Sequence, residues 1–195
     1  DPSQKGRFFS TSFFAGPALR KPIEEGRADF MPIFLADVPR LFTSHTIRLD
    51  AAIIQLSAPD RHGFCTLGTS VDAAKAAADS APLLIAEIND QMPRTHGNTA
   101  VRLRRVSAFI HTDRPLIEHH GSPETHVDAR IGEIIANLVE DGSTLQTGIG
   151  AIPDAVLSRL LDKHDLGVHT EMFSDRVVDL VERGVITNRF NKVHP

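Results

Sequence analysis

The chain has 195 residues, of which 41% are hydrophobic and 24% charged, and its formal net charge is −4 at pH 7. This composition is typical of a folded globular protein and excludes a disordered chain. The small negative charge and the short basic run of Arg102, Arg104 and Arg105 argue against binding to nucleic acid. The single cysteine, Cys65, excludes an internal disulfide framework and favours the cytoplasm, and no apolar stretch approaches the roughly 20 residues that span a membrane.

The first elements that the sequence predicts alternate as strand, helix and strand. The apolar run AAIIQLS at 51–57 predicts a buried strand that ends in a turn at 58–63. The alanine-rich segment 71–81 predicts a helix, and LLIAEIN at 83–89 predicts a second buried strand. Two strands joined in this way form a parallel unit with a right-handed crossover. The loop DQMPRTHGN at 90–98 then leaves the carboxyl end of the second strand, where open α/β sheets bind ligands.

A polar segment with two prolines and a glycine, TDRPLIEHHGSPET, separates this region from the rest of the chain. Its composition is typical of a linker. We therefore expect an amino-terminal α/β domain at 1–113, a linker at 114–126 and a second α/β domain at 127–195.

Two groups of residues that could suggest chemistry receive structural interpretations. Cys65 is interpreted as a small buried residue rather than a nucleophile, because free cysteine is among the most buried residue types. His119, His120 and His126 lack the acidic or thiol neighbours of a closed metal site. The sequence therefore predicts a solvated linker at these histidines and no bound metal.

The second region begins with the pattern of an amphipathic helix, HVDARIGEIIANLVEDG. Thr125 and Asp128 predict a capping box at its start, and Gly142 predicts its end. Apolar residues at i, i+3, i+4, i+7 and i+8 predict a stripe that faces the core. The residues of this stripe are Ile131, Ile134, Ile135, Leu138 and Val139.

Two further strands follow, and each leads into a helix. The sequence predicts a strand at 143–147, a tight glycine turn and a helix at 153–161. It then predicts a strand at 166–171 and a helix that Ser174 caps and Gly184 ends. Because the chain stops soon after this helix, we expect an incomplete second domain and a longer protein. The predicted fold class is α/β, with two open parallel-sheet domains.

Two loops at the carboxyl ends of the last two strands carry the candidate site. Glu171 ends one strand, and the turn Gly148, Ile149 and Gly150 ends the strand before it, so neighbouring strands would place them in one crevice. Backbone N–H groups of such a turn can stabilise a developing negative charge, and a carboxylate opposite them fits a nucleophile facing an oxyanion hole. His169 would share the strand face of Glu171 and support it. Taken alone, these residues equally fit a solvated glutamate and a structural turn.

Four stretches of the sequence resemble one known family in order and spacing. They are FFAGPALRKPIEEGRADFMPIFLADVPRLF, SAPDRHGFCTLGTSVDAAKAAADSA, IAEINDQMPRTHGN and DGSTLQTGIGAIPDAVLSRLLDKHDLGVHTEMFSDRVVDLVERGVITN. Through them the chain is identified as a member of the acetyl-CoA hydrolase/transferase family of class I CoA-transferases. Within the family it most resembles the 4-hydroxybutyrate CoA-transferase branch, and the similarity covers essentially the whole chain.

The resemblance implies an activity and a role for each candidate residue. Glu171, in the motif HTEM, would attack the acyl-CoA thioester and pass coenzyme A between short-chain carboxylic acids, such as acetate and 4-hydroxybutyrate, through a covalent glutamyl-CoA thioester. The turn at 148–150 would donate N–H groups to the thioester oxygen. The loop at 91–97 would face the substrate, and its candidate residues are Gln91, Pro93, Thr95, His96 and Gly97.

The resemblance also implies that coenzyme A enters as a substrate, that no cofactor is bound permanently and that the protein is a homo-oligomer. Arg176 stands where the family usually has glycine, which adds a cation beside the site. Two alternatives stay open: acyl-CoA hydrolysis, in which water resolves the intermediate or Glu171 acts as a general base, and a non-catalytic CoA-binding fragment. Because a further glycine-rich loop of the family would lie beyond Pro195, residues 1–195 alone are expected to be inactive.

Overall fold

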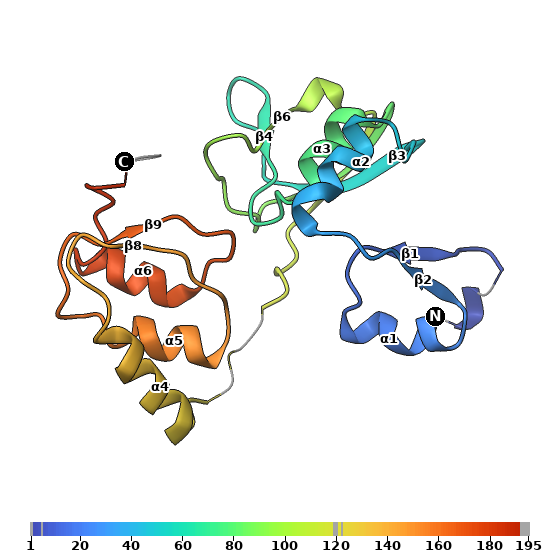
Figure 1. The fold of residues 1–195 in the computed structure, drawn as a ribbon. Coiled ribbons are helices and arrows are strands. Elements are labelled where there is room, and N and C mark those ends of the chain that lie inside the picture. The colour runs from blue at the N-terminus through green and yellow to red at the C-terminus, as the bar shows by residue number, and fades with distance from the viewer. Residues whose placement is uncertain (1, 5, 119–120, 122, 192–195) are drawn as a thin grey trace. The chain divides into compact units, whose positions relative to one another are not determined.

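A computed structural model describes residues 2–4, 6–118, 121 and 123–191 (Figure 1). The chain divides into two compact units, residues 1–117 and 118–195. In each unit helices pack beside parallel strands, so the fold is α/β with open parallel sheets. Within the described residues, no helix is both long enough and apolar enough to cross a membrane.

The main sheet of the first unit contains three parallel strands in the order β3-β5-β7, and these are β3 (Ala51–Leu56), β5 (Leu83–Asn89) and β7 (Ala108–Thr112). The helix α3 (Ala74–Ser80) connects β3 to β5 (Figure 1). The predicted parallel unit of strand, helix and strand is therefore confirmed, although the helix begins three residues later than the alanine-rich segment. The loop at 90–98 leaves the carboxyl end of β5, as the sequence predicts.

The hydrophobic core of the first unit lies on one face of this sheet. Buried and more exposed residues alternate along β3, so one face of the strand packs against α3. The other face leaves Ile53 79% exposed and Ile110 64% exposed, so the prediction of buried strands holds for one face only. Cys65 is fully buried in this core, and burial raises the pKa of its thiol, which favours its structural interpretation. The buried cluster consists of Ala52, Ile54, Leu56, Cys65, Leu67, Ala78, Ala81, Leu84, Ala86 and Val101.

Shorter elements precede and flank the main sheet. The strands β1 (Ser10–Ser12) and β2 (Ala28–Phe30) pair in parallel and are joined by α1 (Pro17–Glu24). The helix α2 (Val38–Thr43) packs against α3, and both contribute to one buried cluster. The remaining elements are the antiparallel strands β4 (Phe64–Thr66) and β6 (Ala100–Arg102) and the 3₁₀ helices η1 (Pro2–Gln4), η2 (Leu35–Asp37) and η3 (Leu103–Arg105).

The described residues of the second unit form three helices and a short pair of parallel strands. The strands β8 (Thr144–Leu145) and β9 (Gly167–Val168) are neighbours, which is the condition for a shared crevice at their carboxyl ends. The helices are α4 (His126–Ala136), α5 (Ala151–Leu157) and α6 (Asp175–Glu182). The core that they enclose includes Leu157, Leu160, Leu166, Val177 and Leu180.

Several boundaries in this unit differ from the prediction. The sequence predicts strands at 143–147 and 166–171, but each observed strand is two residues long. His169 and Glu171 therefore lie beyond the end of β9 rather than on its face. The helix α5 begins two residues before Pro153, so proline is the third helical residue instead of the first.

Both predicted helix caps stand at the first turn of their helices, but they act differently. At α4, the Thr125 hydroxyl accepts a hydrogen bond from the N–H of Asp128, and the Asp128 carboxylate accepts from the N–H of Thr125, so the capping box is confirmed. Ser174 occupies the N-cap position of α6, but its hydroxyl makes no capping hydrogen bond. Gly184 follows α6 with a φ of 73°, as expected for a glycine that ends a helix.

The apolar stripe predicted to face the core is wrong for Ile134, Ile135 and Leu138, which are exposed, whereas Ile131 is half-buried and Val139 packs against the core. The helix packs on α5 through small residues instead, and a Cβ added at Gly132 would lie 2.8 Å from the backbone of Ala155. Ile134 is 51% exposed and Leu138 77% exposed, and α4 ends at Ala136, six residues before Gly142. Close approach of two helix backbones requires small side chains at the contact, and these carry little weight in a hydrophobic pattern.

The histidines of the predicted linker are only partly described. His126 is the exposed first residue of α4. His119 and His120 lie outside the described residues. In the part of the chain that the structure describes, no group of histidine, cysteine and acidic side chains could hold a metal ion.

Candidate active site

The loops that follow β8 and β9 are joined by one side chain, Thr170. Its hydroxyl donates a hydrogen bond to the carbonyl oxygen of Thr147 at 2.8 Å and accepts one from the N–H of Thr147 at 3.1 Å. This hydroxyl takes both backbone groups that a continuing strand would have paired, which explains why the ladder ends after two residues. The two loops predicted to meet therefore lie together at one edge of the strand pair, held by a residue that the sequence analysis does not single out.

The glycine turn presents backbone donors without partners. Gly150 has φ 114° and ψ −174°, a conformation that is essentially restricted to glycine. Among the described residues, no acceptor meets the N–H groups of Gly148, Ile149 or Gly150. These groups are therefore available to an oxygen atom from outside the chain.

Glu171 lies three residues beyond the end of β9, with an exposed side chain. Within the described part of the chain, its carboxylate makes no hydrogen bond or ion pair. His169 is also exposed; its backbone N–H donates to the carbonyl oxygen of Leu145 at 2.9 Å, and no hydrogen bond joins its ring to Glu171. The expected placement of both residues on one strand face is wrong because the strand ends at Val168.

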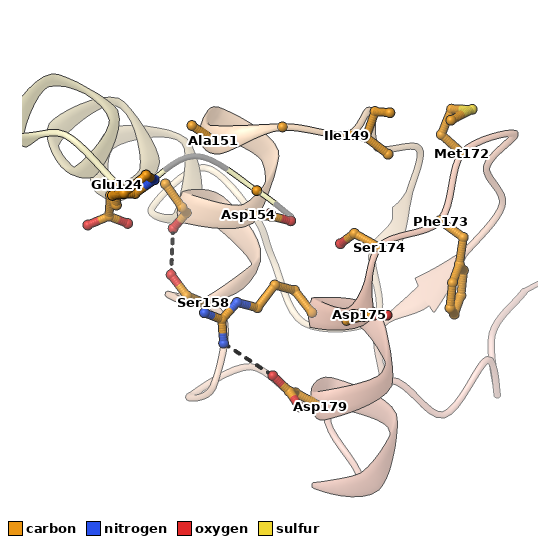
Figure 2. A pocket seen from close by; sticks show the side chains of 15 residues that line it. Glu124, Ile149, Ala151, Asp154, Ser158, Met172, Phe173, Ser174, Asp175 and Asp179 are labelled. Carbon is orange, nitrogen blue, oxygen red and sulfur yellow. Dashed lines mark hydrogen bonds and ion pairs between the residues drawn. The ribbon is translucent and has the colours of Figure 1, made fainter. Parts of the chain in front are cut away.

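A cavity of about 820 Å³ opens beside these loops, within the second unit (Figure 2). Ile149 and Gly150 of the glycine turn line it, together with Met172, the residue after Glu171. Figure 2 shows Asp154, on α5, and Ser174, at the N-cap of α6, beside the cavity. Glu171 itself is not among the lining residues.

Several charged side chains line the cavity or lie beside it. Glu124 pairs with Arg159 through two hydrogen bonds, at 2.8 and 2.9 Å, and these hold the pKa of Glu124 below its usual value. Arg176 donates to Asp179 at 3.3 Å, and both side chains are more than half exposed. Asp154 and Asp175 also line the cavity.

Three buried polar atoms around the site have no hydrogen-bond partner in the described part of the chain. They are Thr147 Oγ1, Asp154 Oδ1 and Ser174 Oγ. Buried polar atoms are normally paired, and an unpaired hydroxyl or carboxylate oxygen is destabilising. The buried polar atoms of these loops are therefore less completely hydrogen-bonded than those of an ordinary protein interior.

The predicted substrate loop of the first unit is held by its own side chains. The Thr95 hydroxyl donates to the carbonyl oxygen of Gly68 at 3.1 Å, and its N–H donates to the Thr66 hydroxyl at 3.2 Å. Gln91 donates through its side-chain amide to Asp113. Two of the predicted substrate-facing side chains, Gln91 and Thr95, are thus engaged in holding the loop.

The remaining predicted residues of this loop are exposed. Pro93, His96 and Gly97 lie on the surface, and Gly97 has a φ of 84° that favours glycine. The His96 ring makes no polar contact within the described residues. His96 is therefore the polar side chain of this loop that stays available to a ligand.

Two residues at the base of the loop were missed by the sequence analysis. Asn89 is fully buried; its side-chain amide donates to the carbonyl oxygen of Arg114 at 3.0 Å and accepts from the N–H of Gln91 at 3.0 Å. Hydrogen bonds from Arg114 and Thr112 lower the pKa of Glu87 from 4.5 to about 2. A polar residue inside the apolar run LLIAEIN is the signal that could have found both.

The sequence of this chain matches the model of a known protein family. The model of the acetyl-CoA hydrolase/transferase N-terminal domain matches residues 3–118. The chain belongs to the acetyl-CoA hydrolase/transferase family. The family expected from the sequence motifs is thereby confirmed.

Curated relatives of this family member are CoA-transferases. A succinyl-CoA:acetate/propanoyl-CoA:succinate CoA transferase of Fasciola hepatica is 51% identical over 192 residues, which are 98% of this chain and 40% of that protein. A 4-hydroxybutyrate coenzyme A transferase of Clostridium kluyveri is 45% identical over 188 residues, which are 96% of this chain and 44% of that protein. Because the first identity exceeds the second, the 4-hydroxybutyrate branch is not singled out.

Two solved structures have a fold similar to that of this chain. The 4-hydroxybutyrate CoA-transferase of Porphyromonas gingivalis superposes with a TM-score of 0.83 at 36% identity, over 100% of this chain and 51% of that chain. RipA from Yersinia pestis superposes with a TM-score of 0.86 at 36% identity, over 92% of this chain and 43% of that chain. This acetyl-CoA hydrolase/transferase family chain therefore spans about half the length of its relatives or less.

Proposed function

We propose that this chain carries the nucleophile of a CoA-transferase that moves coenzyme A between short-chain carboxylic acids. The observation that carries the proposal is the contact between Thr170 and Thr147, which joins the loop of Glu171 to the loop of the turn at 148–150. Among the described residues, the Glu171 carboxylate has no partner and the N–H groups of the turn have no acceptor. The names of the curated relatives support transfer involving succinate, acetate, propanoate and 4-hydroxybutyrate. Because the chain spans 40% and 44% of those two relatives, the activity is proposed for a polypeptide that also carries the rest of their length.

The proposed reaction begins when a carboxylate oxygen of Glu171 attacks the carbonyl carbon of the acyl-CoA thioester. The carbon–sulfur bond breaks, which gives an acyl-glutamyl anhydride and a CoA thiolate. The thiolate then attacks the glutamyl carbonyl carbon, expels the first acid as its carboxylate and leaves a glutamyl-CoA thioester. A second carboxylate reverses these steps, leaves as the new acyl-CoA and regenerates Glu171, so no proton or redox partner is consumed.

The turn at 148–150 is proposed to stabilise the negative charge in these steps. Each attack turns a carbonyl oxygen into an oxyanion, and backbone N–H groups are suitable donors because they need no rearrangement. One such donor typically contributes about 100- to 1000-fold in rate. The unusual φ of Gly150 supports this role, because it fixes the direction of the turn without a side chain in the way.

Further residues complete the proposed protein. We propose that 1–113 and 127–195 are the two α/β domains joined by a linker at 114–126, and that the loop at 91–97 faces the substrate through His96. The unpaired ring of His96 supports this assignment, whereas Gln91 and Thr95 would shape the loop from within. A supporting role for His169, coenzyme A as a substrate rather than a resident cofactor, and a homo-oligomeric state belong to the same proposal.

One observation favours hydrolysis of acyl-CoA as the second candidate. The Glu171 side chain is exposed, so water can reach it as well as a carboxylic acid can. In that reaction water would hydrolyse the intermediate, so that the products are a free acid and coenzyme A and no new acyl-CoA forms. Release of coenzyme A that does not depend on an acceptor acid would indicate hydrolysis, whereas exchange between two acids with ping-pong kinetics would indicate transfer.

The proposed nucleophile is tested by an exchange assay on a polypeptide of the relatives' full length, with labelled acetate and butyryl-CoA as substrates. We expect Glu171→Gln to lower the exchange rate by at least about 1000-fold, because it removes the nucleophile while keeping the shape of the side chain. Glu182→Gln, at an exposed glutamate on α6, is the matched control and should exchange at the original rate. Equal rates for both variants would favour the non-catalytic interpretation.

A further inference from the structure

Thr170 takes no part in the proposed bond changes, yet it is next in the chain to the residue that does. It immediately precedes Glu171. Its hydroxyl bonds to the backbone of Thr147, which immediately precedes the turn at 148–150. Consecutive Cα atoms lie about 3.8 Å apart, so each loop is fixed one residue before the group that the proposed reaction uses.

The hydroxyl of Thr170 also decides where the strand pair ends. The last hydrogen bond of the ladder runs from the N–H of His169 to the carbonyl oxygen of Leu145, at 2.9 Å. Two residues further along, the next bond of a parallel pair would run from the N–H of Glu171 to the carbonyl oxygen of Thr147. That oxygen accepts from the Thr170 hydroxyl instead, at 2.8 Å, and the N–H of Glu171 meets no acceptor among the described residues. The backbone of Glu171 is therefore released from the strand pair while the residue before it is held.

This contact requires a hydroxyl group in particular. The Thr170 oxygen accepts from the N–H of Thr147 at 3.1 Å and donates to the carbonyl oxygen of the same residue. A hydroxyl both donates and accepts at one atom, whereas a carboxylate only accepts and an ammonium group only donates. Serine keeps both hydrogen bonds, and valine keeps the shape of threonine but neither bond. The two substitutions therefore separate hydrogen bonding from packing.

We propose that Thr170 is a positioning residue, whose hydroxyl holds the loop of Glu171 against the loop of the turn at 148–150 and so raises the rate of each attack without touching the substrate. This inference rests on the proposed function, in which Glu171 is the nucleophile. Each attack needs the carboxylate, the carbonyl carbon and the backbone donors in one geometry, and a displacement of about 1 Å can cost about 100-fold in rate. Two hydrogen bonds at the start of the loops reduce such displacements.

A second threonine of the same unit provides a matched control. The Thr187 hydroxyl donates to the carboxylate of Asp165 at 3.0 Å and accepts from the N–H of Arg189 at 3.3 Å. Asp165 lies two residues before β9, whereas Thr170 lies two residues after it. Thr187→Val therefore removes one donated and one accepted hydrogen bond at the opposite end of the strand from the proposed site.

The experiment measures kcat and KM for the exchange of labelled acetate with butyryl-CoA, in a polypeptide of the relatives' full length. We expect Thr170→Val and Thr170→Ala to lower kcat by about 10- to 100-fold, because the loops lose their fixed geometry. The KM for butyryl-CoA should change by less than about twofold, because the hydroxyl does not contact the substrate. Thr170→Ser should retain at least about a third of the original kcat, since it keeps both hydrogen bonds. Thr187→Val should keep the original kcat, and circular dichroism under the assay conditions shows that each variant is folded.

Three results would overturn the proposal: an original kcat in Thr170→Val, equal losses in Thr170→Ser and Thr170→Val, or the same loss in Thr187→Val. The proposed function is tested separately by Glu171→Gln. Full exchange in Glu171→Gln would remove the nucleophile and the positioning role with it. Loss of exchange in Glu171→Gln together with the original kcat in Thr170→Val would keep the nucleophile and remove only the positioning role.

Discussion

The two units hold the loops at the carboxyl ends of their parallel strands in opposite ways. In the first unit, the loop at 90–98 is fixed by a buried Asn89 and by the hydroxyl of Thr95, so its side chains are mostly engaged. In the second unit, Thr170 joins the two loops through its side chain, and within the described residues the Glu171 carboxylate and the N–H groups of the turn at 148–150 have no partners. The side chains of the first loop therefore hold its shape, whereas the second pair of loops leaves a carboxylate and backbone N–H groups available to a ligand.

The largest expected effect on stability lies in the engaged loop of the first unit. Asn89→Ala removes two part-buried hydrogen bonds of a fully buried side chain, to the carbonyl oxygen of Arg114 and from the N–H of Gln91, so we expect a loss of about 3 kcal/mol in the free energy of unfolding. Glu171→Gln should change it by less than about 0.5 kcal/mol, because the carboxylate has no partner within the described part of the chain. Urea unfolding followed by circular dichroism measures both, since the chain has no tryptophan or tyrosine for fluorescence. Similar losses in the two variants would remove the distinction between the loops.

The next effect distinguishes the observed contact face of α4 from the predicted one. Gly132→Ala would place a Cβ 2.8 Å from the backbone of Ala155, so we expect a loss of about 2 kcal/mol in the free energy of unfolding. Ile134→Ala, on the exposed stripe, should cost less than about 1 kcal/mol. Urea unfolding measures both variants. A larger loss of stability in Ile134→Ala than in Gly132→Ala would indicate that the apolar stripe faces the core after all.

A smaller effect compares two threonines at the junction of the site loops. Thr170→Val removes both hydrogen bonds to Thr147, so we expect a loss of about 1 to 2 kcal/mol in the free energy of unfolding. Thr147→Val removes a buried hydroxyl that has no partner among the described residues, so it should leave stability unchanged or raise it by about 1 kcal/mol. Hydrogen exchange at the amide of residue 147 reports the junction directly. Slower opening in Thr170→Val than in the original chain would contradict the junction.

The smallest effect is the pH dependence of the first unit. The folded pKa of Glu87, about 2, lies below its ordinary value of 4.5, so its stabilising contribution is present above that ordinary value and is lost as the pH falls toward 2. Glu87→Gln should therefore lower the stability at neutral pH and flatten its decline below about pH 4.5. Unfolding midpoints in urea at a series of pH values between these limits measure the change. An unchanged acid decline in Glu87→Gln would show that other carboxylates cause it.

Part of the fold was predictable because its signals are local. The strands β3 and β5 are continuous apolar runs, and the capping box of α4 needs only Thr125 and Asp128 at the right spacing. The parallel pairing of β8 with β9 also followed, because strands joined through a helix tend to be parallel neighbours.

The rest depends on contacts that no local pattern contains. The buried face of α4 follows from the close approach of Gly132 to α5, which a hydrophobic pattern does not weigh. The early end of β9 follows from the hydroxyl of Thr170, and the clamp at Asn89 follows from Arg114, which is 25 residues away in sequence. Threonine and asparagine are common in strands and turns, so their side-chain partners become visible only in three dimensions.

The most direct test of the central claim is to map the covalent intermediate. A polypeptide of the relatives' full length is incubated with acetyl-CoA and then treated with borohydride, which reduces a glutamyl-CoA thioester to an alcohol. The protein is digested, and the masses of its peptides are measured by mass spectrometry. We predict an acyl-CoA-dependent mass change on the peptide that contains Glu171, absent in Glu171→Gln. No change at that peptide, or a change at another residue such as Cys65, would contradict the assignment of Glu171 as the nucleophile.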